Sequence, residues 1–302
     1  MLEFKPIELS DKGKIDIFLN EWLFESSEIH FSNLFLWQKS WDIRYDIKNG
    51  FLFIALDREA REMMFAPISI KKGMDIAAAM REAERYFAGI GQPLSICCVT
   101  DELLEQAAGC CSADIEIAID RNNFDYIYLT EDLSKLQGKK YHSKRNQVKS
   151  FMENHRYEYS TLEKEHANGC LELCEKWVRS KNGSMLHLEE ECEAVCRALT
   201  NMDTLGFTGC VILIDELVEA FSIGEQIRPD MAVIHFEKAN AEIKGLYAAV
   251  NMLFAQNRWR GVKYINREED MGIGGLRRSK LSYHPVKMIQ KYSITGAGAN
   301  GS

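Results

Sequence analysis

No stretch of the 302-residue sequence is apolar for long enough to cross a membrane. A membrane-spanning helix needs about 20 consecutive, mostly apolar residues, so we expect no integral membrane segment. The first residues, MLEFKPIELSDKGK, also lack the basic and then apolar pattern of a secretion signal. These absences predict a cytoplasmic protein.

The signatures of several large enzyme classes are absent as well. The sequence contains no GxSxG nucleophile elbow, no P-loop and no HExxH metal motif. These absences argue against α/β-hydrolases, P-loop nucleotide hydrolases and zinc peptidases of the common types.

An excess of positive charge is also absent, because the formal net charge is −8. A surface-wide nucleic-acid binder would be basic, so we expect no DNA partner, although a local basic groove is compatible with this charge. The chain is 46% hydrophobic and 27% charged, which is typical of a globular protein with a sizeable core.

Nine cysteines are an odd number in a chain too large to need disulfides, so reduced thiols are expected. Two pairs with a spacing of four, Cys170 with Cys174 and Cys192 with Cys196, could together hold zinc. Each pair also falls on an apolar helical stripe, where cysteine acts as a small hydrophobic residue. We favour packing and predict no metal site.

Apolar periodicity and turn signals predict an α+β fold with mostly antiparallel strands. Helices are expected near residues 8–24, 74–88, 101–108, 165–180, 188–202 and 244–259. Strands are expected near residues 43–47, 51–56, 63–67, 94–99, 115–119, 126–129, 157–161, 209–214, 217–224, 231–238 and 262–265. The like order of elements in the two halves predicts domains over 1–135 and 136–302, with a flexible tail at about 295–302.

The most basic stretch, residues 138–149 (GKKYHSKRNQVK), holds five Lys or Arg and no acid. It is expected to open a helix capped by Ser143. Lys144, Arg145 and Asn146 are candidates for binding phosphate or another part of a substrate. The alternative is a solvated helix at a domain junction.

A second unusual stretch, residues 264–283, reads YINREEDMGIGGLRRSKLSY. A short strand is followed by acidic residues, a glycine-rich turn and a basic helix start. Acids at the end of a strand that face bases at a helix N-terminus are a common way to build a polar site in α/β proteins. The alternative is a solvated loop.

Together with the early segment FSNLFLWQ, the stretches KRNQVKSF and YINREEDMGIGGLRRSKLSYHP resemble a bacterial family. Its members are similar to the C-terminal domain of phosphatidylglycerol lysyltransferase and to the aminoacyl-tRNA-dependent peptidyltransferases of the Fem type. The resemblance implies tandem GNAT-like domains, each a mixed, mostly antiparallel sheet flanked by helices. It also implies that the second domain carries the site.

The sequence departs from these relatives in two ways. The membrane lysyltransferases carry a transmembrane region, which is not expected here, so a lipid acceptor is not expected. Acetyl-CoA-dependent members of the fold cradle pyrophosphate with a Gln/Arg-x-x-Gly-x-Gly/Ala loop, whereas residues 239–245 here read ANAEIKG. Acyl-CoA therefore lacks its usual signature, and no cofactor is certain.

The resemblance implies transfer of an acyl or aminoacyl group, from aminoacyl-tRNA or acyl-CoA, to an amine or hydroxyl of a small-molecule or peptide-like acceptor. Such transfer needs a base and stabilisation of an oxyanion. The catalytic candidates are Glu225, Glu269, Asp270 and Arg277, with Glu268 and His235 as further bases. The substrate-binding candidates are Lys144, Arg145, Asn146, Asn266, Arg267, Lys280 and Tyr283.

Structural alternatives stand beside these roles. Asp270 could form an ion pair with Arg277 or Arg267, and His235 and Tyr283 could simply be packed. The alternative function is a catalytically silent GNAT-fold protein that binds a ligand or regulates another process.

Overall fold

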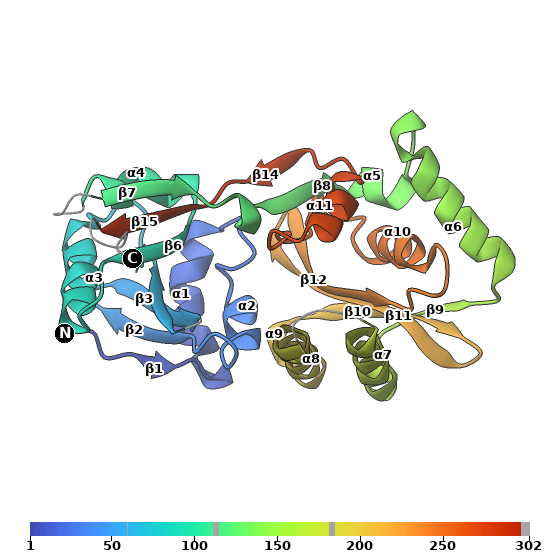
Figure 1. The fold of residues 1–302 in the computed structure, drawn as a ribbon, viewed down its shortest axis with the longest axis horizontal. Helices are drawn as coiled ribbons and strands as arrows, with labels where there is room; N and C mark the ends of the chain where they lie inside the picture. Colours follow the sequence, from blue (N-terminus) through green and yellow to red (C-terminus); the bar gives the residue numbers. More distant parts are fainter. Residues whose placement is uncertain (59, 111–114, 181–184, 297–302) are drawn as a thin grey trace. The chain divides into compact units, whose positions relative to one another are not determined.

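Two mixed β-sheets, each flanked by helices, organise the chain in the computed structural model (Figure 1). The structure describes residues 1–58, 60–110, 115–180 and 185–296. By their contacts, these residues group into two units. Unit 1 comprises Met1–Asp125, Glu269–Ile273 and the segment from Ile289 onward, and unit 2 comprises Tyr126–Glu268 and Gly274–Met288.

The sheet of unit 1 has the strand order β1-β2-β3-β4-β6-β15-β7, with β5 paired to β3. Its pairs are antiparallel except for β4 with β6. The strands are β1 Lys5–Pro6, β2 Arg44–Lys48, β3 Phe51–Arg58, β4 Arg61–Phe65, β5 Ile68–Ser69, β6 Ser95–Val99, β7 Ile115–Ile119 and β15 Tyr292–Gly296. The helices are α1 Lys12–Trp22, α2 Phe31–Leu36, α3 Ala77–Gly89 and α4 Asp101–Ala108.

The sheet of unit 2 has the order β14-β8-β13-β12-β11-β10-β9. Its strands are β8 Asp125–Leu129, β9 Glu158–Thr161, β10 Thr208–Ile214, β11 Leu217–Arg228, β12 Met231–Ala239, β13 Tyr264–Asn266 and β14 Lys287–Ile289. The helices are α5 Thr130–Lys135, α6 His142–Asn154, α7 Ala167–Arg179, α8 Met185–Thr200, α9 Met202–Leu205, α10 Leu246–Arg258 and α11 Gly274–Leu281. In Figure 1, α10 covers one face of this sheet, and α7 and α8 cover the other.

Short 3-10 helices lie at Leu9–Asp11, Arg121–Asn123, Lys139–Tyr141 and Lys164–His166. The apolar stripes that predicted the longer helices are buried, as in α1, where Ile15, Phe18, Leu19 and Trp22 face the core. This burial removes apolar surface from water and holds each helix on its sheet. The predicted α+β class with mostly antiparallel mixed sheets is confirmed.

The two predicted hairpin turns are confirmed, and both use left-handed backbone. Asn49 and Gly50 have φ values of 53° and 78°, and Asp215 and Glu216 have values of 50° and 66°. Positive φ at both central residues matches the twist of the flanking strands, which favours this turn in hairpins. Asn and Gly adopt it readily, whereas Glu216 does so at a cost in strain.

The last residues of the chain, 295–302, were predicted to form a flexible tail. Thr295 and Gly296, where the predicted flexible tail begins, belong to β15, which pairs with both β6 and β7. The rest of the predicted tail, 297–302, lies outside the described residues. Grouping by contacts does not test the prediction of consecutive domains over 1–135 and 136–302, which stays a prediction.

The cap predicted for α6 is also wrong. The helix begins at His142, one residue before Ser143, and the residue at its N-cap is Tyr141. A 3-10 turn at Lys139–Tyr141 leads directly into α6, so the chain is already helical where Ser143 would have capped it.

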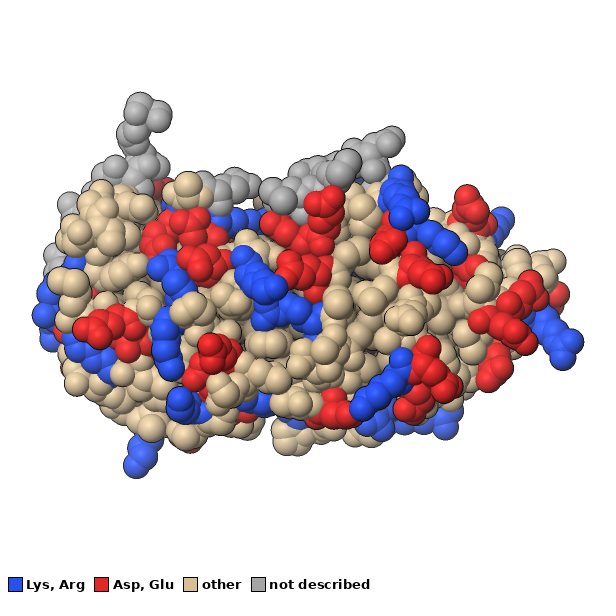
Figure 2. Space-filling model, turned by 90° about the horizontal axis from the view of Figure 1, so that it is seen from below, with Lys and Arg blue, Asp and Glu red and all other residues tan. Residues whose placement is uncertain are grey.

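Charges of both signs share the molecular surface. On the face drawn in Figure 2, Lys and Arg side chains are interspersed with Asp and Glu. Among the described helices, none is long and apolar enough to cross a membrane.

Candidate functional site

In unit 2, the parallel strands β12 and β13 pair over only three residues. Met231, Ala232 and Val233 pair with Tyr264, Ile265 and Asn266, after which β13 ends while β12 continues to Ala239. The side chains that follow β13 therefore meet the unpaired edge of β12. Arg267 and Glu268 both reach residues of that strand.

The first of these contacts is a histidine held between two carboxylates. His235 Nε2 lies 3.0 Å from Glu225 Oε1 on β11, and His235 Nδ1 lies 2.8 Å from Glu268 Oε1. The histidine side chain is 2% exposed, and those of Glu225 and Glu268 are 14% and 19% exposed. The two glutamates are thus the parts of this triad that solvent or a ligand can reach.

The two carboxylates change the charge of His235. Burial alone lowers its pKa, but the hydrogen bonds and charges of Glu225 and Glu268 outweigh burial and raise the pKa to about 9. At neutral pH the ring is an imidazolium that donates to both glutamates. It holds these carboxylates in place and cannot itself accept a proton.

The second contact across the end of β13 joins Arg267 to Glu237. Arg267 Nη2 donates to Glu237 Oε1 at 2.8 Å, and Asn251 of α10 donates to Glu237 Oε2 at 2.9 Å. The other terminal nitrogen, Arg267 Nη1, is buried and has no hydrogen-bond partner among the described residues. A buried donor without a partner costs free energy and marks a place where an acceptor would bind well.

A lysine from α6 approaches the same arginine. Lys144 Nζ lies 3.9 Å from the centroid of the Tyr283 ring, and the guanidinium of Arg267 lies 4.9 Å from the same centroid. Burial and the charge of Arg267 lower the pKa of Lys144 to about 8, although Glu237 opposes this shift. Two cations therefore lie beside one aromatic ring, and the charge of Glu237 acts on both of them.

Two other predicted substrate-binding residues make contacts within the protein. Lys280 Nζ donates to the carbonyl of Arg267 at 2.5 Å, and Asn266 Oδ1 accepts from the backbone N–H of Glu268 at 2.7 Å. Lys280 is 8% exposed and Asn266 is fully buried. These bonds fix the backbone that presents Arg267 and Glu268. Substrate contact by either residue stays a prediction.

The predicted catalytic residues Glu269 and Asp270 belong to unit 1. Asp270 is fully buried, and Arg121 Nη1 lies 3.2 Å from its Oδ2. Its Oδ1 accepts from the backbone N–H of Gly272 at 2.9 Å. Asp270 therefore forms an ion pair with Arg121 of the same unit. Pairing with Arg277 or Arg267 stays a prediction. A catalytic role for Asp270 stays a prediction.

Glu269 lies in an acidic cluster with Glu28 and Asp125, whose oxygens come within 4.8 Å of one another. Lys291 is fully buried and pairs with both Asp125, at 2.6 Å, and Glu28. The spacing of these oxygens would suit a cation, but the lysine ammonium already supplies positive charge there. The described residues contain no other cluster with metal-ligand spacing, and the four helical cysteines do not form one.

The remaining predicted residues are Arg145, Asn146 and Arg277. Arg145 Nη1 donates to the carbonyls of Leu136 and Gly138, the latter at 2.7 Å, and so closes the turn before α6. Asn146 is exposed and contacts His142 at 3.1 Å. Arg277 is half-buried near the start of α11. The structure does not bring these three side chains to Lys144 and Arg267 by any described contact.

The N-terminus of α10 is closed by another helix. Gly245 precedes α10 with a φ of 89°, and an added Cβ there would lie 2.2 Å from the carbonyl oxygen of Gln147 in α6. The close approach of the α6 backbone explains why glycine is needed here. Gly245 ends the segment 239–245, which we compared above with the pyrophosphate loop of acetyl-CoA-dependent members of the fold.

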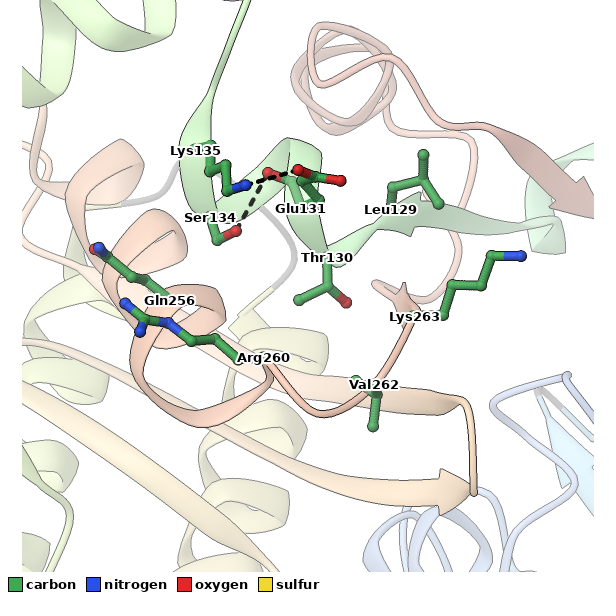
Figure 3. Close-up of a pocket in the computed structure, with 9 residues that line it drawn as sticks. All are labelled: Leu129, Thr130, Glu131, Ser134, Lys135, Gln256, Arg260, Val262 and Lys263. Atoms are coloured by element: carbon green, nitrogen blue, oxygen red, sulfur yellow. Dashed lines mark hydrogen bonds and ion pairs between the residues drawn. The ribbon is translucent and has the colours of Figure 1, made fainter.

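A separate pocket of about 670 Å³ lies between α5 and the end of α10 (Figure 3). None of the predicted site residues lines it. In Figure 3, Lys135 turns to Glu131, while Lys263 points away from Arg260. Because its charged groups diverge instead of converging on one point, we do not assign this pocket a role in catalysis.

Sequence reasoning missed Glu237 and Asn251, which complete the environment of Arg267. The alternation of β12 placed Val233, His235 and Glu237 on one face, and this could have drawn attention to Glu237. Asn251 gave no comparable signal, because a single Asn on a helix is common.

Comparison with known proteins identifies a family to which the sequence is similar. The model of the family described as "Phosphatidylglycerol lysyltransferase, C-terminal" matches residues 22–295. A conserved protein of unknown function from Bacteroides thetaiotaomicron is 30% identical, with a TM-score of 0.86 over 98% of this chain and 100% of that one. The structure of L-PGS from Bacillus licheniformis is 16% identical, with a TM-score of 0.67 over 97% of this chain and 93% of that one.

A tandem GNAT protein from the clavulanic acid biosynthesis pathway is 12% identical, with a TM-score of 0.52 over the whole of both chains. This likeness confirms the tandem GNAT fold. A search among curated proteins gave no match. Because the family model spans nearly the whole sequence, the chain belongs to the family of phosphatidylglycerol lysyltransferase C-terminal domains.

Proposed function

We propose that this protein transfers an acyl or aminoacyl group to an amine or hydroxyl acceptor, at the edge of β12 beyond its pairing with β13. Family membership and the tandem GNAT fold support a transferase of this general type. The residues that we assign to the site are Lys144, Arg267, Glu237, Tyr283 and Glu225.

One observation carries the proposal: two cations lie beside the same aromatic ring, and the charge of one carboxylate, Glu237, opposes both. Lys144 and Arg267 lie beside Tyr283, and the charge of Glu237 acts on both. Arg267 Nη1 has no hydrogen-bond partner among the described residues. An incoming negative charge would be stabilised there. The tetrahedral oxyanion formed during acyl transfer is such a charge, and fixed donors around it lower the barrier most effectively.

The acceptor must lose a proton as it attacks. We propose that Glu225 accepts this proton. Glu225 is a partly exposed carboxylate that the imidazolium of His235 holds in place. Because His235 is protonated at neutral pH, it acts as a positioning residue. Glu268, on the other side of the ring, anchors the imidazolium and fixes its orientation.

For the donor, we favour an aminoacyl ester of tRNA over acyl-CoA. Gln147 closes the N-terminus of α10, which removes the usual cradle for the CoA pyrophosphate. Basic residues of the α6 region, such as Lys140 and Lys149, are 46% and 71% exposed and could contact the phosphate backbone of tRNA. The same closure of α10 also favours the second candidate function, a silent ligand-binding protein.

The test is transfer of label from a pool of aminoacylated tRNAs. Purified protein would be given amine acceptors, peptides carrying a free amine, and vesicles containing phosphatidylglycerol, with Lys144→Met as the matched variant. We expect transfer to one acceptor class and loss of about 100-fold in the variant, since oxyanion donors are worth that much or more. Equal rates in wild type and Lys144→Met would refute the assigned site. Absence of transfer from tRNA and from acyl-CoA would favour the silent binding protein.

A further inference from the structure

The four cysteines of α7 and α8 do not share one environment. Cys170 and Cys174 of α7 are buried, Cys192 of α8 is half-buried, and Cys196 is exposed. The expectation that all four pack as small apolar side chains is therefore wrong for Cys196. Two of them meet across the helix pair, because Cys174 Sγ and Cys192 Sγ lie in hydrogen-bond contact at 2.6 Å.

One buried cation lies beside this pair. Lys238 of β12 is 6% exposed in its side chain, and its Nζ lies 3.3 Å from the centroid of the Trp177 ring. The same Nζ pairs at 2.5 Å with Glu191, the residue before Cys192. A buried ammonium thus lies against both helices next to the two thiols.

The two thiols differ in acidity. The hydrogen bond from Cys174 lowers the pKa of Cys192, and the charge of Lys238 lowers it further, against the effects of burial and of the charges of Glu191 and Glu175. The pKa of Cys174 is raised, first by the hydrogen bond to Cys192 and then by burial. Reactive cysteines are partly exposed, electropositive thiolates, whereas a buried protonated thiol is inert until its partner changes.

From this geometry we propose that Cys174 and Cys192 form an oxidisable dithiol, a modification site in which Cys192 reacts with a peroxide and Cys174 resolves the product. The Cys192 thiolate attacks one oxygen of hydrogen peroxide, the O–O bond breaks, and hydroxide leaves and takes up a proton. The sulfur of Cys174 then attacks the sulfenic acid of Cys192. The S–O bond breaks as the S–S bond forms, and the thiol proton leaves with the hydroxide as water.

The two sulfurs together lose two electrons, and one peroxide becomes two waters. The pair lies on the α7 and α8 side of the sheet, where Lys238 projects, and uses none of the residues assigned to transfer. The inference therefore stands or falls independently of the proposed function.

The test is thiol mapping on the full-length protein. The native protein would be treated with stoichiometric hydrogen peroxide, its free thiols blocked by alkylation, and its peptides analysed by mass spectrometry without reductant. We expect one dominant crosslink, between the peptides that contain Cys174 and Cys192, reversed by dithiothreitol. We also expect a higher Tm after oxidation, because the crosslink restricts the unfolded chain.

Three single variants assign the roles. Cys192→Ser should abolish the crosslink, and Cys174→Ser should leave a sulfenic acid on Cys192 that dimedone traps. Cys196→Ser is the matched control and should form the crosslink in the same yield as wild type. A dominant crosslink through Cys170 or Cys196, or wild-type protein that keeps both thiols free under peroxide, would overturn the proposal. The wild-type mapping decides the matter even where a variant fails to fold.

Discussion

The two units each contain a cluster of charged side chains, and the clusters differ in how deeply they are buried. In unit 1, Glu28, Asp125 and Glu269 surround Lys291, whose side chain is fully buried, as is that of Asp125. In unit 2, Arg267 and Glu237 are 12% and 11% exposed, and a second cation, Lys144, lies nearby. We call the first cluster closed because its lysine and Asp125 are fully buried, and the second open because solvent reaches its charged side chains.

Their electrostatic balance differs in the same way. In unit 1, the pKa of Lys291 is raised by Asp125 and Glu28 despite burial, so its charge is firmly held by the fold. In unit 2, the pKa of Lys144 is lowered to about 8, so its charge is disfavoured by its surroundings. A cation that the folded protein destabilises is better explained by binding than by stability. We therefore interpret the cluster of unit 1 as structural and that of unit 2 as a candidate binding site.

Breaking the closed cluster should have the largest effect on stability. Lys291→Met leaves buried carboxylates without their counter-ion, which should cost about 3–5 kcal/mol of unfolding free energy. Urea unfolding monitored by circular dichroism measures this loss. A loss below about 1 kcal/mol, typical of exposed pairs, would show that the cluster is not closed.

The histidine of unit 2 predicts a pH dependence of stability. Its pKa is about 9 in the folded protein and 6.5 in the unfolded chain, so its stabilisation is complete below pH 6.5 and lost as pH rises through 9. The unfolding free energy should fall by on the order of 3 kcal/mol through this group. Urea unfolding of wild type and His235→Gln between pH 6 and pH 10 isolates it, because only wild type should show the fall. If the unfolding free energy depended on pH in the same way in both proteins, His235 would be neutral in the folded protein.

The open cluster should govern the pH dependence of transfer. Because Lys144 loses its proton near pH 8, kcat/KM should fall about tenfold for each pH unit above 8. Lys144→Arg keeps its charge, so the alkaline fall should disappear or move to higher pH. An unchanged alkaline limb in this variant would mean that another group controls the reaction.

An exposed ion pair provides the smallest expected effect. Lys135 and Glu131 lie 2.7 Å apart on α5, with side chains 52% and 70% exposed. Lys135→Met should change the unfolding free energy by less than about 1 kcal/mol, because solvent screens such pairs. Comparison of this loss with that of Lys291→Met shows how far burial determines what an ion pair contributes to the unfolding free energy. A cost equal to that of Lys291→Met would remove burial as the explanation.

Much of the fold could be predicted from local pattern. Apolar periodicity located the long helices, and the turns at Asn49-Gly50 and Asp215-Glu216 located two hairpins. The placement of β15 between β6 and β7 could not be predicted, because pairing between strands distant in sequence leaves no local signal. Its glycine-rich end resembled a tail instead.

For the candidate site, the sequence singled out two stretches, 138–149 and 264–283, but not how their side chains are arranged. The fold places Lys144 and Arg267, one from each stretch, beside the ring of Tyr283. However, the sequence alone could not show which of the three consecutive acids, Glu268, Glu269 and Asp270, would contact His235. Only the fold shows that Glu268 contacts His235, whereas Asp270 contacts Arg121.

Single-turnover transfer by wild type and Lys144→Met, each at saturating aminoacyl-tRNA, tests the central claim most directly. With the donor saturated, the measured rate reports stabilisation of the transition state and not substrate binding. The account predicts a rate about 100-fold lower in Lys144→Met, with an unchanged Tm because the variant removes a desolvated charge. An unchanged rate in a folded variant would contradict the claim that the open cation pair stabilises the charge formed during transfer.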